Sequence, residues 1–238
     1  MKIFFNVSLL LLILFSAGKI FPQSAEYYFL KGVEFLEDEN FNQALIYFDL
    51  SIEKDPELVE AYNNRGIVKD KLENYEGALK DFNKAVQLNS EYPEIFFNRG
   101  SVLEKLGDQK GALEDYNTAI NIDRLYAKAY LNRGGIKNEI GDYQGALEDL
   151  DFVISVHYEL SQAYWNRAIS KEKLNNLIGA IDDISKVIDM NPEYAEAYFY
   201  RAKLEIVSGD KENACKDLQK AYEMNYEEAL ELINSNCK

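Results

Sequence analysis

Histidine and cysteine are scarce in this chain. One histidine, His157, and two cysteines occur among 238 residues. A single histidine excludes a histidine-rich zinc site, and a catalytic triad would depend on that one residue. No glycine-rich phosphate loop stands out, because each recurring glycine is followed by a predicted helix interior. The sequence therefore contains no recognisable catalytic constellation, and we expect a non-enzyme with no cofactor and no bound metal.

Proline, glycine and basic residues are also few. The chain has 4 prolines and 13 glycines, which favours helices over a succession of tight β-turns. The 26 lysines and arginines are outnumbered by 41 aspartates and glutamates, so the net charge is −15. Because such a surface repels phosphate backbones, we expect no nucleic acid partner. Hydrophobic residues make up 47% of the chain, which is enough for a packed core.

The long hydrophobic run is confined to the N-terminus. Lys2 precedes an apolar stretch over residues 3–17, which is shorter than the roughly 20 residues of a membrane-spanning helix. This pattern is typical of a secretory signal peptide. We predict a signal peptide over residues 1–24, cleaved near Gln23–Ala25, and an exported protein, periplasmic or extracellular. The alternative is an uncleaved anchor, which alone would bring the protein to a membrane.

A 34-residue period dominates the rest of the sequence. Position 4 of each copy is aromatic, position 8 is glycine or alanine, position 20 is alanine, and position 24 is large and apolar. Positions 4, 8 and 11 share one helical face, and so do positions 20, 24 and 27. Each copy therefore predicts two antiparallel helices, and stacked copies bury jointly the face that one hairpin leaves open. The six copies span 25–58, 59–92, 93–126, 127–160, 161–194 and 195–228.

These positions resemble the pattern of the tetratricopeptide repeat (TPR) family, in an exported bacterial form. The resemblance covers residues 25–228, although the family's proline at position 32 occurs only as Pro56 and Pro192. It implies an all-α, right-handed superhelical solenoid of six repeats, with residues 229–238 as a short capping helix. It also implies a scaffold that binds a peptide or protein segment in a concave groove. The alternative function is a structural subunit of a cell-envelope assembly, with contacts on the convex face and the ends.

An arginine recurs at position 7 of copies 2 to 6, on the packing side of the first helix, where the family more often has leucine. A buried guanidinium needs a partner, and an aspartate recurs at position 23 of the same five copies. Copy 1 has neither residue. An anion-binding stripe is the alternative, which the matching negative charges disfavour. The predicted structural ion pairs are Arg65–Asp81, Arg99–Asp115, Arg133–Asp149, Arg167–Asp183 and Arg201–Asp217.

Positions 5 and 6 point away from the second helix, and in the TPR family they line the groove. A carboxamide at position 6 can pair with a peptide unit, and an exposed apolar row at position 5 marks a binding surface. An acidic groove rim would favour a neutral or basic ligand. The alternative is that these side chains only pack against the neighbouring repeat. The predicted peptide-binding residues are Asn64, Asn98, Asn132, Asn166, Phe97, Leu131, Trp165 and Phe199.

Both cysteines lie near the C-terminus. In an exported protein a cysteine pair can be oxidised and stay so. Cys215 falls in the first turn of the last copy's second helix, and the chain turns near Tyr226, midway to Cys237. Two antiparallel helices then return to the same level. We predict a disulfide between Cys215 and Cys237 that holds the capping helix.

Overall fold

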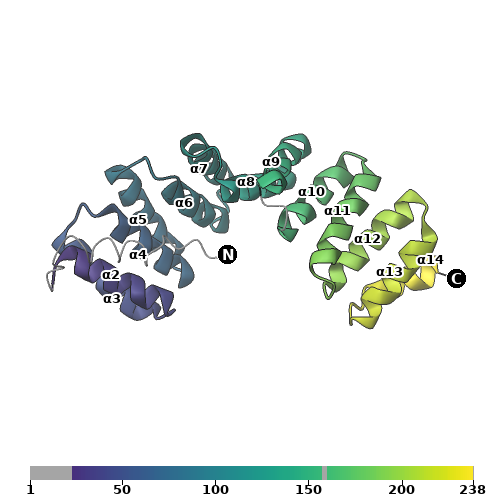
Figure 1. Cartoon of the computed structure of the whole chain (residues 1–238), viewed down its shortest axis with the longest axis horizontal. Coiled ribbons are helices and arrows are strands. Elements are labelled where there is room, and N and C mark those ends of the chain that lie inside the picture. The colour runs from purple at the N-terminus through teal and green to yellow at the C-terminus, as the bar shows by residue number, and fades with distance from the viewer. Residues whose placement is uncertain (1–22, 157–159, 238) are drawn as a thin grey trace. The chain divides into compact units, whose positions relative to one another are not determined.

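A computed structural model of the protein describes residues 23–156 and 160–237, shown in Figure 1. The predicted signal peptide lies outside the described residues, except for its last two positions, and so does His157. The described residues form thirteen α-helices and no strand. The protein is thus an all-α helical repeat solenoid, which confirms the predicted fold class. Across the same residues, no helix is long and apolar enough to span a bilayer.

The chain divides into two compact units, and the first extends to Asp115. Its consecutive helices pack against one another, and the first helices of its three repeats begin 34 residues apart, at positions 25, 59 and 93. The unit contains α2 (Ala25–Glu37), α3 (Phe41–Lys54), α4 (Val59–Lys71), α5 (Tyr75–Leu88), α6 (Pro93–Lys105) and the start of α7 (Gln109–Ile122).

The second unit runs from Tyr116 to Lys238 and contains the end of α7. From residue 127 onward its helices also pack consecutively in chain order. First helices begin at positions 127, 161 and 195, again 34 residues apart. The further elements are α8 (Ala127–Glu139), α9 (Tyr143–Val156), α10 (Ser161–Lys173), α11 (Leu177–Met190), α12 (Ala195–Ser208), α13 (Lys211–Glu223) and α14 (Ala229–Asn236).

Two adjacent residues make the tight turn inside each hairpin. Position 16 caps the second helix: for example, the side chain of Asn74 accepts a hydrogen bond from the Gly77 amide at 3.0 Å. Such a cap satisfies an amide that the first helical turn leaves unpaired. Position 15 takes a left-handed conformation with positive φ, which glycine adopts most easily. It is occupied by Glu39, Glu73, Gly107, Gly141, Asn175 and Gly209.

The residue at position 8 is matched in size to the residue at position 24. A Cβ added to Gly66 would lie 2.8 Å from the ring of Phe82. The first helix can therefore come this close to the second only because position 8 has no side chain. In the fifth repeat, where Ile184 replaces the aromatic ring, Ala168 fits, and both are fully buried in one cluster. The period of the sequence is therefore maintained by complementary packing within each hairpin.

Candidate functional site

Each predicted arginine pairs with its aspartate through two parallel hydrogen bonds. In the fourth repeat Arg133 Nε donates to Asp149 Oδ2 at 2.8 Å, and Nη2 donates to Oδ1 at 2.6 Å. The carboxylate is buried and the guanidinium is partly buried. This fork geometry is the strong form of an ion pair. The same two bonds occur in Arg65–Asp81, Arg99–Asp115, Arg167–Asp183 and Arg201–Asp217.

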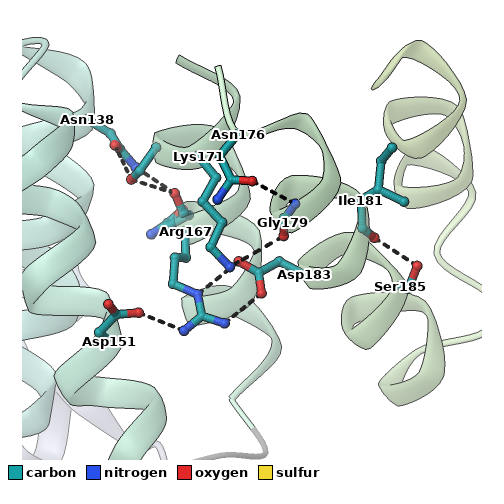
Figure 2. A network of polar contacts seen from close by, with 11 residues as sticks. Asn138, Asp151, Arg167, Lys171, Asn176, Gly179, Ile181, Asp183 and Ser185 are labelled. Carbon is teal, nitrogen blue, oxygen red and sulfur yellow. Dashed lines mark hydrogen bonds and ion pairs between the residues drawn. The ribbon is translucent and has the colours of Figure 1, made fainter. Parts of the chain in front are cut away.

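The third arm of each arginine reaches the preceding repeat, which our sequence reasoning missed. Arg167 Nη1 donates to Asp151 Oδ1 on α9 at 2.7 Å, while the rest of its fork holds Asp183 on α11 (Figure 2). Each arginine thus ties three helices together. The signal in the sequence is a short side chain with an oxygen acceptor at position 25. These acceptors are Asp49, Asn83, Asn117, Asp151 and Ser185.

A lysine at position 11 adds a second cation in three repeats. Lys171 Nζ lies 2.8 Å from Asp183 Oδ2 and donates to the Gly179 carbonyl at 3.4 Å, as Figure 2 shows. Lys69 and Lys137 make the corresponding contacts with their aspartates. The hydrogen bond to Asp183 raises the pKa of Arg167 above its usual value, so this arginine stays charged. Because the guanidiniums already have protein partners, this arrangement is suited to holding helices rather than to binding anions.

The four predicted asparagines have two different environments. Asn98 Nδ2 donates to Asn63 Oδ1 on the preceding first helix at 3.0 Å. Asn132 Nδ2 donates to the Tyr116 hydroxyl at 3.1 Å. The side-chain amides of Asn64 and Asn166 have no hydrogen-bond partner within residues 23–156 and 160–237. Only these last two carboxamides are therefore unoccupied.

The predicted apolar row is more buried than we expected. Leu131 is 8% exposed and packs in a core cluster with Leu150 and Val153, so the exposure expected at this position is not found. Phe97 is partly buried. The reason is that Leu131 packs against its own second helix, from which position 5 was expected to point away, and that Ala163 of the next repeat completes the cluster. The row therefore contributes to packing as well as to the surface.

Trp165 and Phe199 each make ring contacts with tyrosines in the second unit. The ring centroid of Trp165 lies 5.3 Å from that of Tyr194 and 5.2 Å from that of Tyr200. The Phe199 ring lies 4.9 Å from the Tyr226 ring. We call these five partly buried residues the aromatic cluster. Its three tyrosines were not among the predicted site residues, although Tyr200 stands at position 6, where four other repeats have asparagine.

Two charged side chains flank the aromatic cluster. Tyr200 Oη donates to Glu172 Oε2 on α10 at 2.6 Å. Burial raises the pKa of Tyr200, and the Glu172 carboxylate raises it further, so this hydroxyl remains a donor. Lys203 Nζ lies 5.8 Å from the Phe199 ring centroid and 6.0 Å from that of Tyr200. The cluster therefore offers aromatic surface with a carboxylate and an ammonium in contact with it.

First helices in the second unit are also joined by polar contacts. Asn138 Nδ2 donates to the backbone carbonyl of Asn166 at 2.8 Å, and Ser170 Oγ donates to Asn138 Oδ1 at 2.7 Å. Asn138 lies on α8 and reaches toward α10 in Figure 2. These bonds hold α8 against α10 beside the free carboxamide of Asn166. We use the name first-helix face for Asn138 on α8, Trp165 and Asn166 on α10, and Phe199 and Tyr200 on α12.

The last two predicted site residues form a disulfide. Cys215, at the start of α13, and Cys237, just after α14, have Cα atoms 5.6 Å apart. Ala229, the first residue of α14, is fully buried against the last repeat. The disulfide thus connects the far end of α14 to α13. No group of three or more histidine, cysteine or carboxylate side chains that could hold a metal occurs among the described residues.

Comparison with known families matches three parts of the chain. A "TPR repeat" family matches residues 71–107, and two "Tetratricopeptide repeat" families match residues 93–124 and 166–229. The chain is a tetratricopeptide repeat protein. TPR proteins are generally non-catalytic modules that bind proteins or peptides. The comparison of this TPR protein with curated proteins found no match.

Solved structures share the fold of this TPR protein. PilF of Pseudomonas aeruginosa aligns with a TM-score of 0.73 at 18% identity, over 82% of this chain and 89% of that one. A tetratricopeptide repeat protein from Parabacteroides merdae aligns at 0.64 and 21% identity, over 91% and 100%. YrrB, described as a TPR protein with an unusual peptide-binding site, aligns at 0.63 and 24% identity, over 74% and 90%. At these identities the likeness shows the fold alone.

Proposed function

We propose that this TPR protein is an exported scaffold, without enzymatic activity, that binds an extended peptide or protein segment on the first-helix face of its second unit. The observation that carries the proposal is the aromatic cluster around Trp165, which is followed on α10 by Asn166, whose carboxamide is unoccupied within the described residues. Partly buried tryptophan and tyrosine often supply most of the binding energy of an interface. The TPR fold supports a scaffold, and YrrB is a structural neighbour described with a peptide-binding site.

The chemistry of the face favours a neutral or basic ligand. Asn166 offers one acceptor and two donors, which suit a peptide unit of any sequence. Glu172 places a carboxylate at the aromatic cluster, and the chain has a net charge of −15. Opposite charge accelerates association, and like charge opposes it. We therefore expect no nucleic acid partner. In the first unit, Asn64 and Phe97 occupy the equivalent positions and would bind separately.

A peptide selection would test the proposal. Peptides are selected from a random display library against residues 25–238, and the affinity of each selected peptide is then measured by calorimetry. The Trp165→Ala variant removes the centre of the aromatic cluster, and Tyr222→Ala is the matched control, because Tyr222 is an exposed aromatic residue on α13. Weaker binding by Trp165→Ala alone supports the proposal. Weaker binding by Tyr222→Ala alone supports a second-helix surface, and with it a structural subunit of an envelope assembly.

Export is tested separately. The proposal is that residues 1–24 direct the chain out of the cytosol and are removed near Gln23–Ala25. Mass spectrometry of the protein purified from its native host would then find an N-terminus at these positions. An intact N-terminus in the membrane fraction would instead support the uncleaved anchor.

A further inference from the structure

The last repeat reverses the charge at position 11. In α4, α8 and α10 this position is a lysine whose Nζ lies within 2.9 Å of the aspartate at position 23. In α12 the same position is Glu205. The last repeat thus has a carboxylate where three others have an ammonium. The aspartate at position 23 is retained as Asp217. The last repeat therefore has two acidic side chains where those three repeats have a lysine–aspartate ion pair.

Glu205 is buried without a sufficient partner. Glu205 is 6% exposed, and its Oε2 atom has no hydrogen-bond partner in the described part of the chain. Its Oε1 lies 4.0 Å from Arg201 Nε. A buried carboxylate without a close cation or donors is costly in its ionised form.

Arg201 cannot compensate for both carboxylates. Its Nε donates to Asp217 Oδ2 at 2.6 Å, its Nη2 donates to Oδ1 at 2.9 Å, and its Nη1 donates to Ser185 on α11 at 2.9 Å. The guanidinium is therefore committed to Asp217 on α13 and to the preceding repeat. The single positive charge of Arg201 therefore lies near two carboxylates, those of Asp217 and Glu205.

Three charged groups act on Glu205 from the elements around it. Asp217 on α13 and Asp210, the N-cap of α13, repel its negative form, whereas Arg201 on its own helix favours it. On α11 the group that contacts Arg201 is the neutral hydroxyl of Ser185, which accepts a hydrogen bond from it and adds no charge. Burial, reinforced by Asp217, raises the pKa of Glu205 from 4.5 to about 7. The balance of these groups favours a neutral side chain in the closed hairpin.

We propose that Glu205 is a proton-operated switch in the last repeat: when it is neutral, the α12–α13 hairpin is closed, and when it loses its proton, this hairpin opens locally. Because the carboxyl is more basic in the closed form than in an opened one, closure is favoured at low pH and weakens as the pH rises through 7. The disulfide keeps α14 attached to α13, so the opened segment can close again. α12 also carries Phe199 and Tyr200 of the aromatic cluster, so opening would disturb that surface.

Amide hydrogen exchange of the disulfide-bonded protein, residues 25–238, tests the proposal. Protection factors are measured for peptides from α12 and α13 at pH 6 and pH 8.5, after correction for the intrinsic exchange rate at each pH. With a carboxyl pKa of about 7 when closed and 4.5 when open, the opening equilibrium should increase about tenfold over this range. Peptides from α4 and α5 serve as an internal reference.

Three variants isolate the carboxyl group. Glu205→Gln keeps the shape of the side chain without the titration, and Glu205→Lys introduces beside Asp217 the lysine that three other repeats have at this position. Both should abolish the pH dependence in α12 and α13. Glu193→Gln, at an exposed site just before α12, should retain it. Protection that is independent of pH in the native chain, or an unchanged response in Glu205→Gln, would overturn the proposal.

Discussion

Arg133 Nε donates to Asp149 Oδ2 at 2.8 Å, and this contact joins α8 to α9 in the fourth repeat. Lys137 Nζ lies 2.9 Å from the same carboxylate oxygen. The aspartate therefore keeps one cation when the arginine is lost. In the third repeat the situation differs, because position 11 is Leu103 and cannot supply a second cation to Asp115.

The two repeats should therefore respond differently to the loss of arginine. Arg99→Leu leaves Asp115 buried without a cation, and we expect the free energy of unfolding to fall by about 3–5 kcal/mol. Arg133→Leu should cost less, because Lys137 remains on Asp149. Urea denaturation followed by circular dichroism measures both. Equal losses would show that the lysine contributes nothing.

The double variant Arg99→Leu/Asp115→Leu should regain much of the stability lost in Arg99→Leu. Removing both partners eliminates the unpaired buried charge and leaves an apolar contact in its place. The control is Asp115→Leu alone, which leaves the partly buried Arg99 without its partner. A double variant no more stable than the worse single variant would contradict an ion pair between these residues.

Stability should depend on pH through Glu205. Its pKa is raised from 4.5 to about 7 in the folded chain, so the native protein should lose stability as the pH rises from 4.5 through about 7 and should change little above that. Glu205→Gln should therefore stabilise the protein at pH 8.5 by about 2–3 kcal/mol, and have little effect at pH 5. Urea denaturation at the two pH values measures the difference. The same effect at both pH values would point to packing rather than charge.

The left-handed turn position offers a pair of opposite substitutions. Glu73 has φ of 59°, and Gly107 occupies the equivalent position with φ of 82°. Glu73→Gly should stabilise the protein by about 0.5–1 kcal/mol, because glycine adopts positive φ without strain. Gly107→Ala should destabilise it by about 1 kcal/mol, although a Cβ there would meet no atom within 4 Å. Thermal melting measures both, and a stabilising Gly107→Ala would contradict this explanation.

The disulfide should stabilise the C-terminal end. The bridge joins residues 22 positions apart, and by the loop-entropy estimate it contributes roughly 3 kcal/mol. Cys215→Ser/Cys237→Ser should therefore unfold at a lower urea concentration than the native protein, and hydrogen exchange should increase first in α14. Mass spectrometry of the unreduced native protein provides the control, since two free thiols would refute the bridge.

The free and bonded asparagines should differ in a binding experiment. The carboxamide of Asn166 is unoccupied within the described residues, whereas Asn132 is bonded to Tyr116. With a selected peptide, Asn166→Ala should weaken binding by about 0.5–1.5 kcal/mol, and Asn132→Ala should have a smaller effect. Calorimetry measures both affinities, and circular dichroism confirms that the variants keep their helices. A larger loss in Asn132→Ala would show that our assignment of the two side chains is wrong.

The sequence by itself determined the repeat, the helix pairs and the arginine–aspartate pairing. The pairing was readable because position 7 and position 23 face each other within one hairpin, so both residues recur together in five copies. The same holds for Gly66 and Phe82, whose sizes are matched at positions 8 and 24. Such contacts lie within one hairpin, and they recur along the chain because the repeats share the same hairpin geometry.

Only the tertiary structure decided what happens between repeats. It placed Asp151 on Arg167, buried Leu131, and brought Trp165 into contact with Tyr194 and Tyr200. It also left the Oε2 atom of Glu205 without a hydrogen-bond partner in the described part of the chain, which the period does not predict, because Glu205 departs from the lysine of three other repeats. The physical reason is that these outcomes depend on how neighbouring helices cover one another and on how several charges share one buried space. Neither the covering of one helix by its neighbours nor the sharing of a buried space by several charges can be read from a single position in the sequence.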